Sequence, residues 1–334
     1  MRVIATGIAG FIGYHLTKRL LREGVEVVGV DNINDYYDVE LKYARLAELG
    51  FEREHIEEKR LIRSAAHPTL QLFKCDIAER EAIEQLFKEQ RPDVVINLAA
   101  QAGVRYSLEQ PFAYTHSNVE GFLSILEGCR RAEVKRLIYA SSSSVYGSNS
   151  KVPFSEEDTV EQPQSLYAAT KRSNELMASC YEQLYSIECI GLRFFTVYGP
   201  WGRPDMAPML FTDAITHHRA IKVFGEGELW RDFTYIDDVV EGVWKIVAGD
   251  KPAPHRLYNI GHSEPVKLTE FIATLEQTIG KEAKKEYLPQ QAGDVERTWA
   301  DCSRLEQDFA YHPTTSLSQG IAEFVKWYKE YYKA

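Results

Sequence analysis

The sequence predicts an α/β protein with a doubly wound parallel sheet and a smaller mixed α/β lobe. Short apolar runs alternate with helical patterns through the first half of the chain. Closely spaced glycines follow the first of these runs, and an acidic residue ends the second. Strand–helix alternation of this kind favours a parallel sheet that helices cover on both faces.

The first half of the chain supplies the elements of this sheet. Its apolar runs predict strands at 2–6, 26–30, 70–75, 94–98, 136–141 and 188–193. The patterns between them predict helices near 11–23, 79–89, 111–131 and 166–184. Beyond Val197 prolines and glycines interrupt the order, and we expect strands at 222–224 and 257–260 and helices near 237–248, 268–279 and 317–332.

The turn after the first strand carries the spacing of a dinucleotide site. Gly7 allows a tight turn, Gly10 lets the main chain approach a pyrophosphate, and Gly13 lets the helix pack against the strand. The helix N-terminus offers free N–H groups and partial positive charge to the phosphates. A glycine triplet alone could be an ordinary turn, but the flanking strand and helix predict a Rossmann-type nucleotide site.

Asp31 closes the second apolar run, Val25–Val30. A carboxylate there can accept hydrogen bonds from both hydroxyls of the adenosine ribose, and it repels a 2′-phosphate. The sequence therefore predicts NAD as cofactor rather than NADP.

Two domains are expected from this pattern. Residues 1–196 should form the NAD-binding domain, and residues 197–334 should mainly form a substrate-binding lobe, with some segments returning to the first domain. The stretch 35–67 is a charged excursion with helical periodicity. We interpret it as one or two exposed helices that decorate the domain.

Composition narrows the class of partners. The chain has 334 residues, of which 44% are hydrophobic, and a net charge of −10 without a long basic run. Nucleic acid is therefore not an expected partner, and no apolar stretch is long enough to predict a membrane span. The N-terminus has the pattern of a core strand rather than a signal peptide. The five cysteines show neither metal-ligand nor redox-pair spacing, so we expect reduced thiols, no metal and a cytoplasmic enzyme.

Tyr167 and Lys171 form a candidate reactive pair. They share a helix face at positions i and i+4. A phenol ordinarily loses its proton near pH ~10, and a neighbouring ammonium together with a positive nicotinamide ring would favour the phenolate. Ser141–Ser144, at the end of the fifth main strand, could relay a proton or hold the reacting oxygen. Each signal alone is common by chance, because the tyrosine could be a core residue and the lysine a solvated one. Their order after the nucleotide motif is more specific.

With these residues in place, the chain resembles the extended short-chain dehydrogenase/reductase family over nearly its whole length. The resemblance is carried by T-G-I-A-G-F-I-G (6–13), N-L-A-A (97–100), S-S-S-S-V-Y-G (141–147) and Y-A-A-T-K (167–171). Within that family the chain is most similar to the UDP-glucuronate 4-epimerases. The distinctive stretches are D-N-I-N-D-Y-Y-D (31–38), A-A-Q-A-G-V-R-Y-S (99–107), L-R-F-F-T-V-Y-G-P-W-G-R-P-D-M-A (192–207), R-D-F-T-Y-I-D-D (231–238) and G-D-V (293–295).

The resemblance implies a set of site residues and a homodimer. It implies catalysis by Ser142, Tyr167 and Lys171, and dimerisation through the helices near 111–131 and 166–184. Asp76 and Ile77 should meet the adenine, and Phe195 should pack near the nicotinamide. The full set of residues expected to contact NAD is Gly7, Gly10, Phe11, Ile12, Gly13, Asp31, Asn32, Asp76, Ile77, Leu98, Ala99, Ala100, Asn118, Tyr167, Lys171 and Phe195. The UDP-sugar should be bound by Val104, Arg105, Ser142, Ser143, Ser144, Thr196, Arg203, Arg231 and Asp294, with Arg231 and Asp294 holding the diphosphate and the uridine ribose.

The resemblance also implies transient oxidation of the sugar at C4, with hydride passed to NAD and returned to the opposite face. Related dehydratases carry Asp-Glu at the positions of Ser143 and Ser144, and related decarboxylases tend to carry Glu at the position of Ser144. Two hydroxyls cannot act as a carboxylate base, which favours epimerisation of UDP-glucuronate to UDP-galacturonate. The alternatives are a UDP-glucose or UDP-N-acetylhexosamine 4-epimerase, a UDP-glucuronate decarboxylase, and a non-catalytic NAD-binding sensor.

An oxidised glucuronate is a β-keto acid that readily loses carbon dioxide. We hypothesise that Ser143, Ser144 and Thr196 hold the carboxylate out of the reactive alignment, and that Arg203 helps to place the sugar. Thr196 could instead cap its own strand end. Arg105, Arg203 and Arg231 could be surface arginines, although the glycines, prolines and aromatics around them favour ligand contacts.

Overall fold

The computed structural model describes residues 1–249, 256–289 and 295–333. It divides into two compact units. The first comprises 1–147, 159–193 and 243–258, and the second comprises 148–158, 194–242 and 259–334. The main division thus falls after Arg193, beside the expected boundary at 196, and one later segment returns to the first unit. The segment 148–158 leaves the first unit for the second, which the sequence did not indicate.

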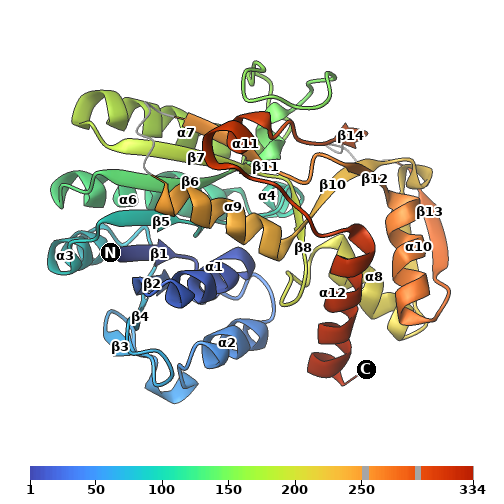
Figure 1. Cartoon of the computed structure of the whole chain (residues 1–334), viewed down its shortest axis with the longest axis horizontal. Coiled ribbons are helices and arrows are strands. Elements are labelled where there is room, and N and C mark those ends of the chain that lie inside the picture. Colours follow the sequence, from blue (N-terminus) through green and yellow to red (C-terminus); the bar gives the residue numbers. More distant parts are fainter. Residues whose placement is uncertain (250–255, 290–294, 334) are drawn as a thin grey trace. The chain divides into compact units, whose positions relative to one another are not determined.

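An eight-stranded sheet organises the first unit (Figure 1). Its strands are β1 (Arg2–Thr6), β2 (Glu26–Asp31), β3 (Leu61–Arg63), β4 (Leu70–Lys74), β5 (Val94–Asn97), β6 (Arg136–Ser142), β7 (Glu188–Phe194) and β11 (Arg256–Ile260). They lie in the order β11-β7-β6-β5-β1-β2-β4-β3. The order reverses on either side of β1, and open α/β sheets bind ligands at such a switch point, at the carboxyl ends of the strands.

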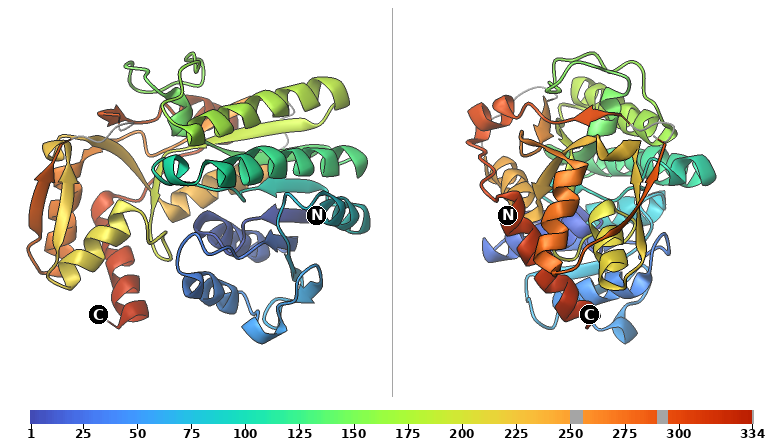
Figure 2. Two further views of the ribbon diagram at one scale, coloured as in Figure 1. Left: turned by 180° about the vertical axis from the view of Figure 1, so that it is seen from behind. Right: turned by 90° about the vertical axis from the view of Figure 1, so that its right-hand side faces the viewer.

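Helices cover both faces of this sheet. Figures 1 and 2 show α3, α6 and α7 along one face and α1 on the other. The helical elements up to residue 193 are α1 (Phe11–Arg22), α2 (Val39–Glu48), η1 (Arg53–His55), α3 (Arg80–Gln90), α4 (Tyr106–Glu109), α5 (Pro111–Tyr114), η2 (Thr115–Glu120), α6 (Gly121–Arg131), η3 (Ser143–Tyr146) and α7 (Leu166–Tyr185). The expectation of a doubly wound Rossmann-type sheet is confirmed.

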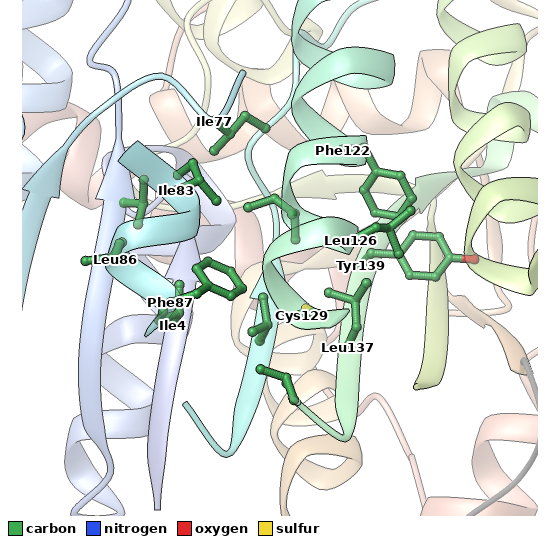
Figure 3. Packing of buried hydrophobic residues seen from close by; sticks show 14 of the residues in the cluster. Ile4, Ile77, Ile83, Leu86, Phe87, Phe122, Leu126, Cys129, Leu137 and Tyr139 are labelled. Atoms are coloured by element: carbon green, nitrogen blue, oxygen red, sulfur yellow. The ribbon is translucent and has the colours of Figure 1, made fainter. Parts of the chain in front are cut away.

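The core of the first unit lies between the sheet and the helices α3 and α6 (Figure 3). Ile4 and Leu137 come from the sheet, Phe87 from α3 and Leu126 from α6, and none of the four is exposed. Apolar residues at helical spacing on α3 and α6 face strands that are continuously apolar, and the sequence displays both patterns. This packing fixes the strand ends from which the site is built.

The predicted helix at 111–131 contains an irregular segment. It runs as α5, then a π-helical stretch η2, then α6. Wider turns of this type are frequent at functional sites. Here the stretch carries Asn118, which is 2% exposed and heavily hydrogen-bonded.

The excursion at 35–67 differs from its expectation. It holds one α-helix, a short 3₁₀ turn and an edge strand, β3, which pairs antiparallel with β4. The interpretation of a solvated decoration is wrong for α2, because Leu41 and Leu46 are buried in that helix together with Lys42 and Arg45. Buried charged side chains need partners, and these partners are described below.

The second unit holds smaller sheets and its own helices. Strands β12 (Pro265–Lys267), β10 (Trp230–Tyr235), β14 (Arg297–Thr298) and β8 (Thr196–Tyr198) form one sheet, and β9 (Ala220–Phe224) pairs with β13 (Lys284–Leu288). Its helical elements are α8 (Ala207–Thr216), η4 (Gly225–Gly227), α10 (Leu268–Ile279), α11 (Ser303–Phe309) and α12 (Leu317–Tyr332). Helix α9 (Ile236–Ala248) begins in this unit and ends in the first. Trp201 packs on Trp327 and Tyr331 within this unit.

The cysteines agree with the expectation of reduced thiols. All five cysteines are free thiols, four buried and Cys180 exposed. Within the ranges described above, no helix is long and apolar enough to cross a membrane.

Candidate active site

The glycine turn after β1 is as tight as its sequence requires. Gly7 has φ +78°, and a Cβ there would lie 2.9 Å from the backbone nitrogen of Ala99. A Cβ on Gly13 would lie 2.1 Å from the Gly7 oxygen. Side chains at either position would therefore force the turn apart, and α1 could not start so close to β1. The turn leaves the N-terminus of α1 open to an anion, because Gly10 provides no side-chain cap.

Thr6 ties the end of β1 to the end of β5. Its hydroxyl donates to Asn97 Oδ1 (2.7 Å) and accepts from the Ala99 backbone N–H (3.0 Å). The segment Leu98–Ala100 is thereby held against the glycine turn and is half-buried. The predicted cofactor residues of β1 and β5 thus lie together at one edge of the sheet.

Asp31 occupies the end of β2 beside the same turn. Its carboxylate accepts hydrogen bonds from the backbone N–H groups of Ala9 (2.9 Å) and Ile33 (2.8 Å). It is 8% exposed. A carboxylate offers about four lone-pair sites, so two bonds fix its orientation and leave acceptor capacity for a pair of ribose hydroxyls.

Asn32 and Asp76 lie together at the ends of the neighbouring strands β2 and β4. Asn32 Nδ2 donates to Asp76 Oδ2 at 2.8 Å, and the Ala78 N–H donates to Asp76 Oδ1 at 2.9 Å. His116, from η2, lies 3.5 Å from the same carboxylate. Asp76, which was expected to meet the adenine, therefore lies beside Asn32 and His116, and its neighbour Ile77 is buried.

Asn118 forms hydrogen bonds with other protein groups through both its side chain and its backbone. Its side chain accepts from the Gln101 N–H (2.8 Å) and donates to the Gln101 oxygen and the Thr170 hydroxyl (3.0 Å each). Its backbone oxygen accepts from Asn174 Nδ2 at 2.6 Å. Asn118 therefore joins the loop after β5 to helix α7, and it positions both.

Tyr167 and Lys171 lie on consecutive turns of α7, at its N-terminal end. Ser165 caps this helix by accepting from the Ala168 N–H at 3.1 Å. A phenolate in the first turn of a helix is favoured by the partial positive charge there. Tyr167 is half-buried, and its ring lies 6.0 Å from that of Tyr114.

Lys171 is 2% exposed, and its ammonium donates to the Ala140 oxygen at 3.0 Å. Burial lowers the pKa of this lysine to about 8, since a dry site penalises the charged form. An ammonium with a pKa of about 8 is still mostly charged near neutral pH, and it gives up its proton more readily than an ordinary lysine does.

Lys171→Met should change the pH dependence of stability. Lys171 binds its proton more weakly in the folded than in the unfolded protein. Burial of the charged ammonium therefore lowers the free energy of unfolding by its full amount below about pH 8, and this loss disappears above pH 10.5. Urea unfolding of cofactor-free protein should show the wild type gaining about 2 kcal/mol relative to the variant between about pH 7.5 and about pH 9.5. A gap between the two proteins that stays constant with pH would contradict the buried, weakened ammonium.

The serines follow at the end of β6. Ser142 caps η3 by accepting from the Ser144 N–H, and its hydroxyl lies 3.2 Å from the Ser144 hydroxyl. Ser142 is 8% exposed. Ala140 accepts from Lys171, so this strand end is tied directly to the reactive helix.

A buried ion-pair network that the sequence reasoning missed lies behind these residues. Glu175 is not exposed, and it accepts from Ser141 Oγ (2.7 Å), from Arg193 Nε and Nη2 (2.8 and 3.0 Å) and from Arg172 (2.9 Å). Burial opposes the charge of Glu175, but the arginine and serine bonds outweigh it and hold its pKa below the usual value. The signal was available, because Glu175 continues the i, i+4 series of Tyr167 and Lys171.

Several other predicted residues lie in the second unit. Phe195 is buried and donates its N–H to the Ile260 oxygen at 3.1 Å. Thr196 pairs with Phe233 in the β8–β10 ladder, and Arg231 lies on β10. Arg203 forms an ion pair with Asp205. Asp294 lies outside the described residues.

Asp232, next to Arg231, was not singled out from the sequence. It is not exposed, and it accepts from the N–H groups of His262 (2.6 Å), Ser263 (3.0 Å) and Ala300 (3.0 Å). Burial raises the pKa of this carboxyl despite those bonds. It fixes the segments on both sides of β10 and so sets the backbone that carries Arg231.

Val104 and Arg105 immediately precede α4 in the first unit. Val104 is half-buried and Arg105 is exposed. They lie on the loop after β5, at the edge of the sheet that carries the glycine turn. The described residues contain no cluster of His, Cys, Asp and Glu that could hold a metal ion.

Comparison with known proteins identifies the family. The model of the NAD dependent epimerase/dehydratase family matches residues 3–261. The chain belongs to this family. It is 44% identical to the probable UDP-glucuronate 4-epimerase of Rhizobium meliloti, covering 100% of this chain and 98% of that protein. It is 46% identical to Protein CapI of Staphylococcus aureus, covering 100% of both chains.

Solved structures of this epimerase/dehydratase family agree with the sequence comparison. The UDP-glucuronic acid 4-epimerase of Bacillus cereus, in complex with UDP-glucuronic acid and NAD, superposes with a TM-score of 0.89 at 33% identity. The match covers 99% of this chain and 100% of that one. The resemblance to the extended short-chain dehydrogenases and, within them, to UDP-glucuronate 4-epimerases is confirmed.

The residues of this family member fit NAD. The glycine turn has no room for a side chain at Gly7 or Gly13, and the main chain of Gly10 stands before a helix N-terminus. The oriented carboxylate of Asp31 lies where the second strand ends. Both are features of a dinucleotide site that accepts NAD.

Proposed function

We propose that this chain is an NAD-dependent 4-epimerase that converts UDP-glucuronate to UDP-galacturonate. The observation that carries the proposal is the strand end beside Tyr167 and Lys171, which offers the hydroxyls of Ser142, Ser143 and Ser144 and no carboxylate. Removal of water or carbon dioxide from the sugar needs a further acid or base at that point. Full-length similarity to UDP-glucuronate 4-epimerases supports the same conclusion.

The proton chemistry follows from the position of Tyr167. The glycine turn and Asp31 would hold NAD, which would supply reversible hydride exchange with C4 of the sugar. Tyr167 takes the proton of the 4-hydroxyl and gives it back, helped by the charge of Lys171 and by the start of α7. Ser142, held by its bond with Ser144, orients the reacting oxygen. The sugar must turn over between the two hydride steps, so the chain has to hold the nucleotide while the sugar moves.

We assign the nucleotide and the carboxylate to the remaining residues. Arg231 and Asp294 bind the diphosphate and the uridine ribose, and Val104, Arg105 and Arg203 help to place the sugar. Ser143, Ser144 and Thr196 hold the substrate carboxylate away from the alignment in which a β-keto acid loses carbon dioxide. A charge-assisted hydrogen bond contributes roughly 1.5–3 kcal/mol, which is enough to bias that competition about tenfold or more. In this assignment residues 1–196 hold the cofactor and contribute several contacts to the sugar, and residues 197–334 mainly serve the UDP-sugar.

A single incubation tests the function. Purified protein with UDP-glucuronate should give one isobaric product with the chromatographic behaviour of UDP-galacturonate, and no UDP-pentose. UDP-glucose and UDP-N-acetylglucosamine serve as parallel substrates and should turn over far more slowly. A product lighter by carbon dioxide would identify a decarboxylase, and the absence of turnover with bound NAD would support a sensor.

We further propose a cytoplasmic homodimer. Exposed leucines follow one stripe of α7, with Leu176 and Leu184 exposed to 53% and 70%. Leu123 on the adjacent α6 is 42% exposed and Phe112 on α5 is 85% exposed. Apolar surface of this kind marks a protein contact, and a second copy would cover it. Five reduced thiols suit the cytoplasm.

Charging the stripe should break the dimer. Leu176→Glu combined with Leu184→Glu should give a monomer in light scattering, because four buried carboxylates would meet at the interface. Leu210→Glu is the matched control, since Leu210 is 50% exposed on α8 in the other unit. A monomeric wild type, or a dimer that survives the double substitution, would exclude this interface.

A further inference from the structure

A row of tyrosine rings connects the excursion to the reactive helix. The ring centroids of Tyr36 and Tyr106 lie 4.8 Å apart, those of Tyr106 and Tyr114 6.3 Å, and those of Tyr114 and Tyr167 6.0 Å. Aromatic pairs at such separations attract each other beyond the burial of their surface. The row starts in the loop between β2 and α2 and ends at the residue that exchanges the proton.

The sheet order shows what the first contact of this row spans. Tyr36 follows β2 and Tyr106 follows β5, and β1 lies between these strands. All three strands are parallel, so their loops leave from the same edge. The glycine turn follows β1 at that edge. The contact of Tyr36 with Tyr106 therefore joins the loops on either side of the turn on which a pyrophosphate is expected to rest.

The loop that carries Tyr36 is held in place by its own helix. Lys42 Nζ donates to the backbone oxygen and to Oδ1 of Asn34, at 2.6 Å each. Asp38 caps α2 by accepting from the Glu40 N–H at 3.0 Å. Lys42 is 6% exposed, so its ammonium is committed to this loop.

Helix α2 is in turn attached to the glycine turn itself. Arg45 is not exposed, and it donates to the Ala9 oxygen and to the Tyr37 hydroxyl, at 2.7 Å each. The N–H of the same Ala9 donates to Asp31. The excursion thus binds the backbone of the nucleotide-binding turn through Arg45, and it contacts the loop on the other side of the turn through Tyr36.

We propose that residues 32–45 form a strap over bound NAD, closed by the contact of Tyr36 with Tyr106, which slows release of the cofactor. This inference rests on the proposed function. An enzyme that returns its hydride to the same substrate never needs to exchange NAD, so slow release does not limit its turnover. The strap must open for NAD to leave, and opening separates the two rings.

Release of NAD tests the strap directly. The protein is loaded with labelled NAD, passed through a desalting column and chased with excess unlabelled NAD, and the label that remains bound is followed in time. Tyr36→Ala and Tyr106→Ala should each release label about tenfold faster than the wild type, because each loses the ring pair and its burial. The double variant should be no faster than about the faster single variant, since both remove one contact.

Two matched controls isolate the contact. Tyr36→Phe keeps the ring and should release NAD at the wild-type rate. Tyr43→Ala removes a ring from α2 that packs on Arg53, at 4.1 Å, and should also leave the rate unchanged. Wild-type rates in Tyr36→Ala and Tyr106→Ala, or equal acceleration by Tyr43→Ala, would overturn the strap while the proposed function stands. A wild type that binds no NAD at any concentration would overturn the NAD site and the strap with it.

Discussion

Tyr167→Phe should abolish epimerisation while leaving NAD bound. The substitution removes only the phenolic oxygen, which takes the proton from the sugar and returns it. Proton transfer by a positioned side chain contributes about 10²–10⁴-fold, so kcat with UDP-glucuronate should fall by about 10³-fold. The measurement is the initial rate of UDP-galacturonate formation by the variant and the wild type, with bound NAD quantified in the same preparations.

A second tyrosine on the same helix provides the control. The hydroxyl of Tyr181 donates a hydrogen bond to Glu127 at 2.6 Å. The proposed chemistry uses neither of these residues. Tyr181→Phe should therefore keep near wild-type turnover. Turnover by Tyr167→Phe above about a tenth of the wild-type rate would remove this residue from the chemistry.

Glu175→Ala should destabilise the first unit strongly. The substitution leaves Arg193, 1% exposed, without its carboxylate, and it strips Ser141 of its acceptor. Breaking a buried ion pair from one side costs about 3–5 kcal/mol, a large part of the stability of an ordinary domain. Urea unfolding followed by tryptophan fluorescence or circular dichroism measures the loss.

The matched variants separate charge burial from simple loss of contact. Glu175→Leu combined with Arg193→Met removes both charges and should recover much of the lost free energy. Arg172→Ala removes the half-exposed partner of Glu175 and should cost about 1 kcal/mol or less. If the free energy of unfolding of Glu175→Ala lies within about 1 kcal/mol of the wild-type value, the network does not support the reactive helix.

The regular part of the fold could be predicted because its signals are local. The strand 2–6, the glycine turn and the helix after it are encoded within one short stretch, and the structure reproduces them nearly residue for residue. The pair Tyr167 and Lys171 was found for the same reason, since four residues of helix place both on one face. Apolar periodicity and glycine spacing do not depend on distant partners.

The parts that differed depend on contacts between distant residues. The excursion looked solvated because Lys42 and Arg45 are charged, and only the structure supplies the Asn34 and Ala9 oxygens that satisfy them. The three residues of β3 pair only with β4, too short a run to give a sequence pattern. The π-helical stretch η2 likewise carries Asn118, whose partners Gln101 and Thr170 lie 17 and 52 positions away.

Burial of single carboxylates was also not recognised from the sequence. Glu175 and Asp232 lie close to residues that were singled out, yet neither was recognised, because most of their partners come from 18 to 68 positions away. A carboxylate is expected on the surface unless the N–H groups or the guanidinium that would surround it are known.

Hydride transfer at C4 is the claim on which the whole account rests, and an isotope label tests it. UDP-glucuronate that carries deuterium at C4 should give UDP-galacturonate that keeps its deuterium at C4, because the hydride leaves and returns within one active site. The reaction in ordinary water should incorporate no solvent hydrogen at that carbon. Deuterium lost to water, or a labelled pentose in place of the epimer, would contradict the account.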